Sequence, residues 1–105
     1  MDKLINEYNE IAVIHTDAPG SPWSSGYPHQ TATRLCMDKT IARAVQRCNL
    51  NAAIIAATRI APDFQVLPDT SLTITWLPAN TEFLIEERDG CETVITKDEL
   101  KFFTT

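Results

Sequence analysis

The chain has 105 residues, of which 44% are hydrophobic and 22% are charged. These proportions are typical of a globular domain and exclude a disordered or low-complexity scaffold. The length accommodates one compact domain, so we expect a single domain over residues 1–105. The formal net charge of −5 argues against a protein that coats nucleic acid or an anionic membrane.

Residues 2–14 carry apolar side chains at the spacing of an amphipathic helix. Leu4, Tyr8 and Ile11 recur three or four positions apart, which is the stripe that one helical face presents. We therefore expect a helix over residues 2–14. The apolar run at residues 11–14 is also compatible with a short strand, so the sequence leaves the end of this element open.

Residues 15–30 form a segment that cannot be a regular element, because three prolines and two glycines interrupt it. Most connections in compact domains are about 4–6 residues long, so a loop of this length is either functional or mobile. It carries Trp23 and Tyr27. If exposed, these aromatic side chains are anchors for a partner; alternatively, they tuck under the sheet and hold the loop down.

Two further helices are expected, over about residues 32–48 and 51–60, with a bend at the intervening asparagines. Asp38 is placed to cap a run whose apolar side chains fall on one face. The second segment is short and rich in alanine and isoleucine. Its periodicity is also compatible with a strand, but the helix propensity of alanine favours a helix.

Beyond Pro62 the pattern changes to strands. Residues 72–77 alternate between apolar and polar side chains, and the pair Asp89-Gly90 between two apolar runs is the strongest short hairpin signal. We expect an antiparallel β-meander over about residues 64–104, including strands at 64–67 and 100–104. Helices followed by an antiparallel sheet predict the α+β class.

Charge is unevenly distributed along the chain. Basic residues outnumber acidic ones in residues 31–60, and acidic residues dominate from 61 to 105. Lys39, Arg43 and Arg47 are spaced four apart, so on a helix they form one basic stripe. Clustered arginines suit a phosphate-bearing ligand, but a solvated face whose charges pair within the molecule gives the same pattern.

No catalytic, metal or cofactor motif is present, and we expect neither an enzyme nor a bound cofactor. His15 and His29 are the only histidines, and with Asp17 and Cys36 they match no recurring zinc spacing. The three cysteines are an odd and sparse set that indicates free thiols. With no signal-peptide pattern at the N-terminus and no long apolar run, we expect a cytoplasmic protein.

These features favour a small acidic binding protein that sterically inhibits a larger partner, as immunity proteins and phage anti-defence proteins do. The partner would carry a basic surface, such as one that binds nucleic acid. The residues expected to contact it are the loop aromatics and the acidic side chains of the hairpin: Trp23, Tyr27, Glu82, Glu86, Glu87, Asp89 and Glu92.

Two other functions are compatible with the sequence. In the first, the chain is a homo-oligomer whose alanine-rich helix packs against its copy. Lys39, Arg43 and Arg47 then bind a small anionic, nucleotide-like ligand. In the second, the order of helix, bend, helix and hairpin is that of a winged-helix DNA-binding protein. The acidic hairpin argues against this second function, because it would repel the phosphate backbone.

Overall fold

Two antiparallel strand pairs and three helices make up the described part of the chain, residues 2–97 of a computed structural model. The elements in chain order are β1 (Glu10–Thr16), α1 (His29–Met37), α2 (Lys39–Gln46), α3 (Leu50–Ile60), β2 (Leu72–Pro78), β3 (Phe83–Arg88) and β4 (Cys91–Thr96). The α+β class is confirmed. None of the helices within residues 2–97 has the length and hydropathy needed to cross a bilayer.

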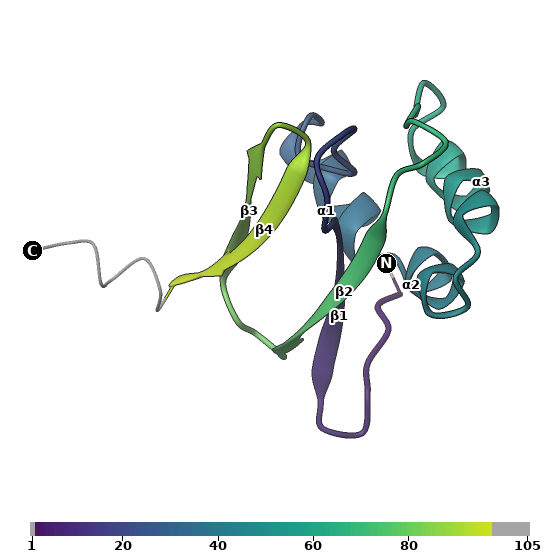
Figure 1. Ribbon diagram of the computed structural model, residues 1–105. Coiled ribbons are helices and arrows are strands. Elements are labelled where there is room, and N and C mark those ends of the chain that lie inside the picture. The colour runs from purple at the N-terminus through teal and green to yellow at the C-terminus, as the bar shows by residue number, and fades with distance from the viewer. Residues whose placement is uncertain (1, 98–105) are drawn as a thin grey trace, which may run out of the picture.

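A two-stranded ribbon of β1 and β2 runs through the centre of the molecule (Figure 1). Helices α2 and α3 lie on one side of this ribbon, and the β3–β4 hairpin lies on the other (Figure 1). Strand β4 lies next to β1, and α1 packs against β1 as well. Strand β1 is therefore the element that the helices and the hairpin share.

The helix expected over residues 2–14 does not form. The chain instead makes a turn and then enters strand β1. Asn9 has a φ of 58°, a left-handed conformation that ends any right-handed helix. The Asn6 carboxamide oxygen accepts from the backbone N–H groups of Tyr8 and Glu10, which fixes the turn. The alternative, a strand in the apolar run at 11–14, is confirmed.

Strand β1 is buried on both of its faces, which explains why its apolar run does not alternate. Ala12 and Ile14 point into the large core formed with the helices. Val13 points to the other side, into a smaller core that Cys36 and Leu77 share. A short continuous apolar run is typical of such a fully buried strand.

The segment expected as one helix over 32–48 is two helices separated by Asp38. This residue has extended backbone angles, and its carboxylate accepts from the N–H of Ile41, so it ends α1 and caps α2. The bend at the asparagines is confirmed, because Asn49 caps the next helix through the N–H of Ala52. The helix expected at 51–60 is α3.

The strands after α3 are antiparallel, but they do not form one continuous meander. Strand β2 pairs with β1, whereas within residues 2–97 strand β3 pairs only with β4. Residues 64–67 are not a strand, because Phe64 turns inward as part of the core. The strand expected at 100–104 lies outside the described residues. Strand β2, which pairs with β1, stands between α3 and the β3–β4 hairpin.

The predicted Asp89-Gly90 hairpin is confirmed in detail. Both residues have positive φ, 54° and 83°, which is the geometry of the two-residue type I′ turn. The turn packs on the preceding long loop, where the N–H of Gly20 donates to the Asp89 carbonyl oxygen. A Cβ atom on Gly90 would overlap the backbone of Gly20.

We expect Gly90→Ala to lower the free energy of unfolding by about 2–4 kcal/mol, because the side chain would meet both a left-handed backbone and the Gly20 main chain. Urea denaturation followed by circular dichroism measures the change. Gly26→Ala is the matched control. No atom lies near its added Cβ, so we expect a change of no more than about 1 kcal/mol. Equal effects of the two substitutions would contradict this account.

Candidate functional site

A buried carboxylate holds the long loop, strand β1 and the hairpin together. Glu92 is only 2% exposed. One of its oxygens accepts from the N–H of Thr16 at 3.0 Å, and the other accepts from the N–H groups of Ser24 and Ser25 at 3.1 and 3.0 Å. A carboxylate that accepts several backbone N–H groups is satisfied without a cation. Glu92 is therefore a structural anchor, and its expected role as a surface contact is wrong.

His15 and Thr16 extend this buried polar cluster across three strands. The Thr16 hydroxyl donates to the Gly90 carbonyl oxygen and accepts from the Glu92 N–H. The Nδ1 atom of His15 lies 2.9 Å from the Thr16 carbonyl oxygen and 3.1 Å from that of Glu92, so it carries the proton. The Nε2 atom then accepts from the Thr75 hydroxyl at 2.7 Å. Both ring nitrogens are thereby used in joining β1, β2 and β4.

Trp23 is a core residue, and its expected role as an exposed anchor is wrong. Its side chain is 0% exposed, and the indole N–H donates to the Leu35 carbonyl oxygen at 2.9 Å. The ring makes an edge contact with Phe64. Tyr27 stacks on the Phe64 ring and is half-buried. The alternative interpretation of the loop aromatics, that they hold the loop down, is the correct one for Trp23.

A groove of about 610 Å³ lies between α1 and β3. One wall is a single face of α1, with Ala32, Thr33, Cys36 and Met37 at helical spacing. The opposite wall is the edge of β3 and the residues before it, and Tyr27 closes the loop side. The lining is mostly apolar, as ligand and peptide sites are in general. The complete lining is Ser24, Tyr27, His29, Ala32, Thr33, Cys36, Met37, Thr81, Glu82, Phe83, Leu84 and Ile85.

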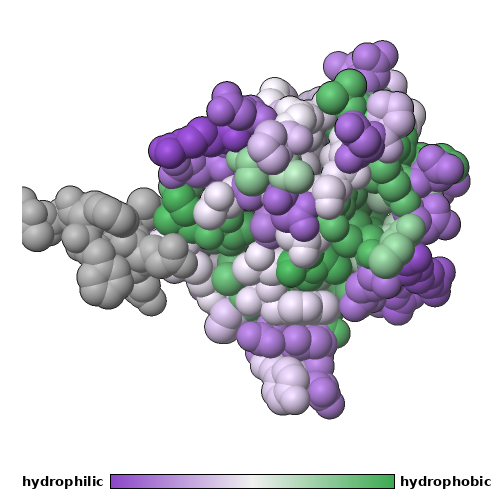
Figure 2. Space-filling view, in the orientation of Figure 1, coloured by the Kyte–Doolittle hydropathy of each residue, from purple (hydrophilic) through white to green (hydrophobic). Residues whose placement is uncertain are grey.

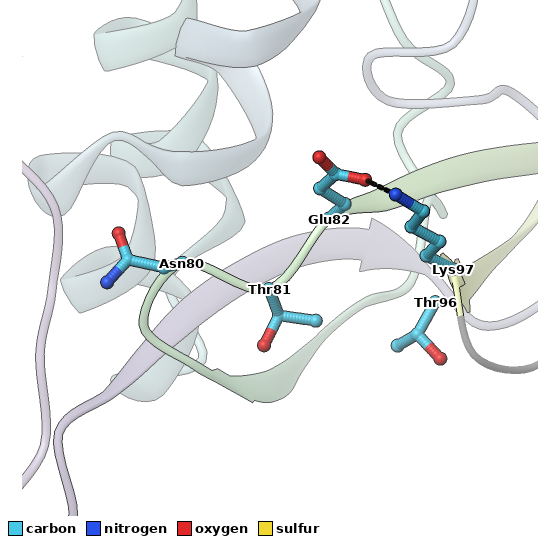
Figure 3. A pocket seen from close by; sticks show the side chains of 5 residues that line it. All are labelled: Asn80, Thr81, Glu82, Thr96 and Lys97. Atoms are coloured by element: carbon cyan, nitrogen blue, oxygen red, sulfur yellow. Dashed lines mark ion pairs between the residues drawn. The ribbon is translucent and has the colours of Figure 1, made fainter.

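An ion pair stands at one end of the groove. Figure 3 shows the side chains of Glu82 and Lys97 pointing toward each other, whereas Asn80, Thr81 and Thr96 point away from them. The Glu82 carboxylate lies 3.0 Å from the Lys97 ammonium, and both side chains are well exposed. An exposed pair of this kind contributes about 0–1 kcal/mol, so it adds little stability here. The five residues drawn in Figure 3 line a small pocket of their own. This pocket adjoins the groove, because Thr81 and Glu82 line both.

The remaining acidic residues of the hairpin are exposed, as expected. Glu86 pairs with Arg88 at 3.3 Å, Glu87 accepts from the Gly90 N–H, and Asp89 lies at the turn. Figure 2 shows hydrophilic residues gathered above exposed hydrophobic ones on the hairpin side of the molecule. Of the seven residues expected to contact a partner, the structure brings Tyr27 and Glu82 to the groove, and it places Glu86 and Glu87 on β3 and Asp89 at the turn that follows.

The basic stripe lies on a different part of the molecule. Arg43 and Arg47 are exposed and line a depression of about 280 Å³ between α2 and α3, together with Thr40, Ala44, Asn49 and Ala52. Lys39 is half-buried and does not line it. The structure thus brings two of the three stripe residues together.

The sequence missed both the groove and the buried anchor. A signal for the anchor is present: on β4, Glu92 shares a face with Val94, which packs in the smaller core, so strict alternation predicts that Glu92 points inward. No comparable signal exists for the groove, because α1 and β3 are far apart in the chain. In the described part of the chain, no three His, Cys, Asp or Glu side chains gather closely enough to hold a metal ion.

The Cys36 thiol, which lies in the groove wall, has low reactivity at neutral pH. Burial is the main cause that raises its pKa to about 12, and the charge of Glu92 adds to this. The thiol therefore stays protonated at neutral pH and is a poor nucleophile or metal ligand. Its part in the groove is that of a small apolar side chain.

No family model matches this chain, and none of the curated proteins or solved structures compared with it is a match. The geometry of the chain's own residues is therefore the basis for any functional conclusion.

We expect Glu92→Gln to destabilise the protein by about 2–4 kcal/mol, because one oxygen is replaced by an NH₂ group that faces backbone donors in a buried site. Urea denaturation gives the value. Glu86→Gln is the matched control on the same hairpin, and at this exposed position we expect a change within about 0.5 kcal/mol. A Glu92→Gln variant as stable as the control would show that the carboxylate is not the anchor.

We also expect Cys36 to resist thiol reagents at about pH 8 in the folded protein, because its raised pKa leaves almost no thiolate there. Cys48, which is exposed, should react at once. The measurement is the rate of reaction with a chromogenic disulfide in a Cys48→Ser/Cys91→Ser variant, where Cys36 is the remaining thiol. The rate should rise steadily between pH 8 and 10. A plateau below pH 9 would contradict the high pKa.

Proposed function

We propose that this chain is a non-catalytic, acidic binding protein that sterically inhibits a larger protein partner. The site is the groove between α1 and β3, and the ligand is an extended, basic and apolar segment of that partner. The observation that carries the proposal is the largest hollow described here, which has apolar walls and lies beside exposed glutamates. When a segment of the partner is bound in the groove, this domain of 105 residues sits on the partner. A domain of this size is large enough to block a neighbouring surface of the partner.

The walls of the groove supply the apolar contact that such a complex needs. Leu84 is 44% exposed at its rim, and Met37 and Phe83 line it from opposite sides. Met and aromatic side chains are enriched at interfaces, and methionine adapts to partners of irregular shape. The lining contains Glu82 but, among the described lining residues, no lysine or arginine.

The charge around the groove favours a basic partner. Glu86, Glu87 and Asp89 are exposed along the hairpin, and the whole chain has a formal net charge of −5. Complementary charge accelerates association and selects partners more than it increases affinity. The free thiols of Cys36, Cys48 and Cys91 support a reducing compartment, and we place this function in the cytoplasm.

A second candidate function rests on the basic depression between α2 and α3. Arg43 and Arg47 both line one hollow, and two arginines at one site suit a small phosphate-bearing ligand. We rank it below the first, because the depression is smaller and no aromatic side chain lines it.

Site-specific photocrosslinking in the cells that produce the protein tests the first function. A photoreactive residue is placed at Leu84, at the rim of the groove, or at Ile55, a comparably exposed apolar residue on α3. We expect one protein partner to crosslink at position 84 and not at position 55. The double substitution Glu86→Lys/Glu87→Lys should remove most of this product, because it reverses the charge that a basic segment meets.

The charge-reversed pair Arg43→Glu/Arg47→Glu is the control, and it should leave the product at position 84 intact. Crosslinks at position 55 alone, or loss of the product in this control, would move the site to α2 and α3. A crosslink only between copies of the chain would replace the inhibitor with a homo-oligomer.

A further inference from the structure

One edge of β3 has main-chain groups that are unpaired within residues 2–97. In an antiparallel pair, successive residues of a strand alternately face the partner strand and point away from it. The type I′ turn pairs Arg88 with Cys91, and the N–H of Lys97 donates to the Glu82 carbonyl oxygen. The even-numbered residues from 82 to 88 therefore face β4. Phe83, Ile85 and Glu87 direct their N–H and C=O groups to the opposite edge.

No element of the described chain covers this edge. Strand β4 lies on the side toward β1, and β3 has β4 as its sole strand neighbour within residues 2–97. No main-chain hydrogen bond reaches the outward groups of Phe83, Ile85 or Glu87 from the described residues. Natural proteins normally protect such an edge, so an open one beside a groove is a template for another strand.

The groove lies along this edge. Phe83, Leu84 and Ile85 are consecutive in its wall, as they must be if the strand edge itself forms that wall. Cys36 and Met37 of α1 pack in the same small core as Phe83 and Ile85, so α1 covers the face of β3 toward which alternate side chains of an added strand would point. From Phe83 to Glu87 the edge extends about 13 Å at the rise of a β-strand, which accommodates a segment of about five residues.

The charges on β3 identify the kind of segment that fits. One face of the strand presents Phe83 and Ile85 to the smaller core, so one set of alternate side chains in an added strand meets apolar surface. Glu86 on the other face and Glu87 at the end are exposed acids. Opposite charges on neighbouring strands stabilise the pair, whereas like charges destabilise it. A second copy of this acidic chain is a poorer occupant than a basic segment.

We propose that the groove binds its partner by β-strand addition: an extended segment with alternating apolar and basic residues pairs with the free edge of β3. This inference deepens the proposed function and rests on it. Main-chain hydrogen bonds to Phe83, Ile85 and Glu87 hold the segment, and the groove selects its apolar side chains. This division of affinity and specificity is common to peptide binding by strand addition.

Amide hydrogen exchange with a defined probe tests the proposal. The probe is the blocked hexapeptide Lys-Val-Lys-Val-Lys-Val, and the control peptide has glutamate in place of lysine. In the free protein, the amides of residues 83, 85 and 87 should exchange rapidly while those of 84, 86 and 88 are protected. Millimolar probe should slow exchange at the first set by at least about tenfold, and the control peptide should not.

A proline substitution separates strand addition from simple burial in the groove. Glu87→Pro removes an N–H group that points away from β4, so the hairpin is retained. Glu87→Val removes the same carboxylate and keeps the N–H. We expect the proline variant to bind the probe about tenfold more weakly than the valine variant, because it has lost one main-chain hydrogen bond and its ring obstructs the edge.

Each other outcome overturns the strand addition in a different way. Probe binding that shifts the resonances of Ala32 and Met37 without protecting the edge amides leaves the groove function standing and rejects the β-strand mode. Equal binding by the two Glu87 variants rejects it as well. If the edge amides are already protected in the free protein, the edge has another occupant. Protection that depends on protein concentration identifies a second copy of the chain, and protection that does not identifies residues 98–105. No binding of the probe rejects both the mode and the basic segment.

Discussion

The rest of the structure depends on the buried Glu92 carboxylate, which accepts hydrogen bonds from three backbone N–H groups. It joins the end of β1, the middle of the long loop and the start of β4. Hydrogen bonds to a charged acceptor are stronger than neutral ones, and an unpaired buried carboxylate is very costly. The hairpin and the loop must therefore satisfy it together, and their relative position follows.

That position creates the groove. The loop leads directly into α1, and Trp23 fixes the helix to the core through the Leu35 carbonyl oxygen, so α1 forms a rigid wall. The hairpin is set against β1 by the contacts of β4 and by the small core around Val13 and Cys36. Strand β3 consequently faces α1 across the groove. If the groove binds a partner as proposed, walls that are both anchored need little rearrangement, which lowers the entropic cost of association.

Acidic side chains outnumber basic ones on the hairpin, whereas the charged side chains of α2 are basic. Glu86, Glu87 and Asp89 are exposed on the hairpin, while Arg43 and Arg47 line the depression between α2 and α3. Within the described residues, the ion pairs join Arg88 to Glu86 and Lys97 to Glu82, both on or beside the hairpin. These two pairs therefore do not connect the hairpin to Arg43 or Arg47.

The sequence by itself determined the α+β class, the Asp38 and Asn49 caps, the helix at α3 and the type I′ hairpin, because each depends on residues that are neighbours in the chain. Only the tertiary structure decided that residues 10–16 form a strand, that β2 pairs with β1, that Trp23 is buried and that Glu92 is an anchor. A stripe such as Leu4, Tyr8 and Ile11 has the period of a helix in isolation. Pairing with β2 across some sixty residues of chain, and burial from two sides, outweighs that local preference. The groove belongs to the same category, because its walls come from α1 and β3, which the chain brings together only through the core between them.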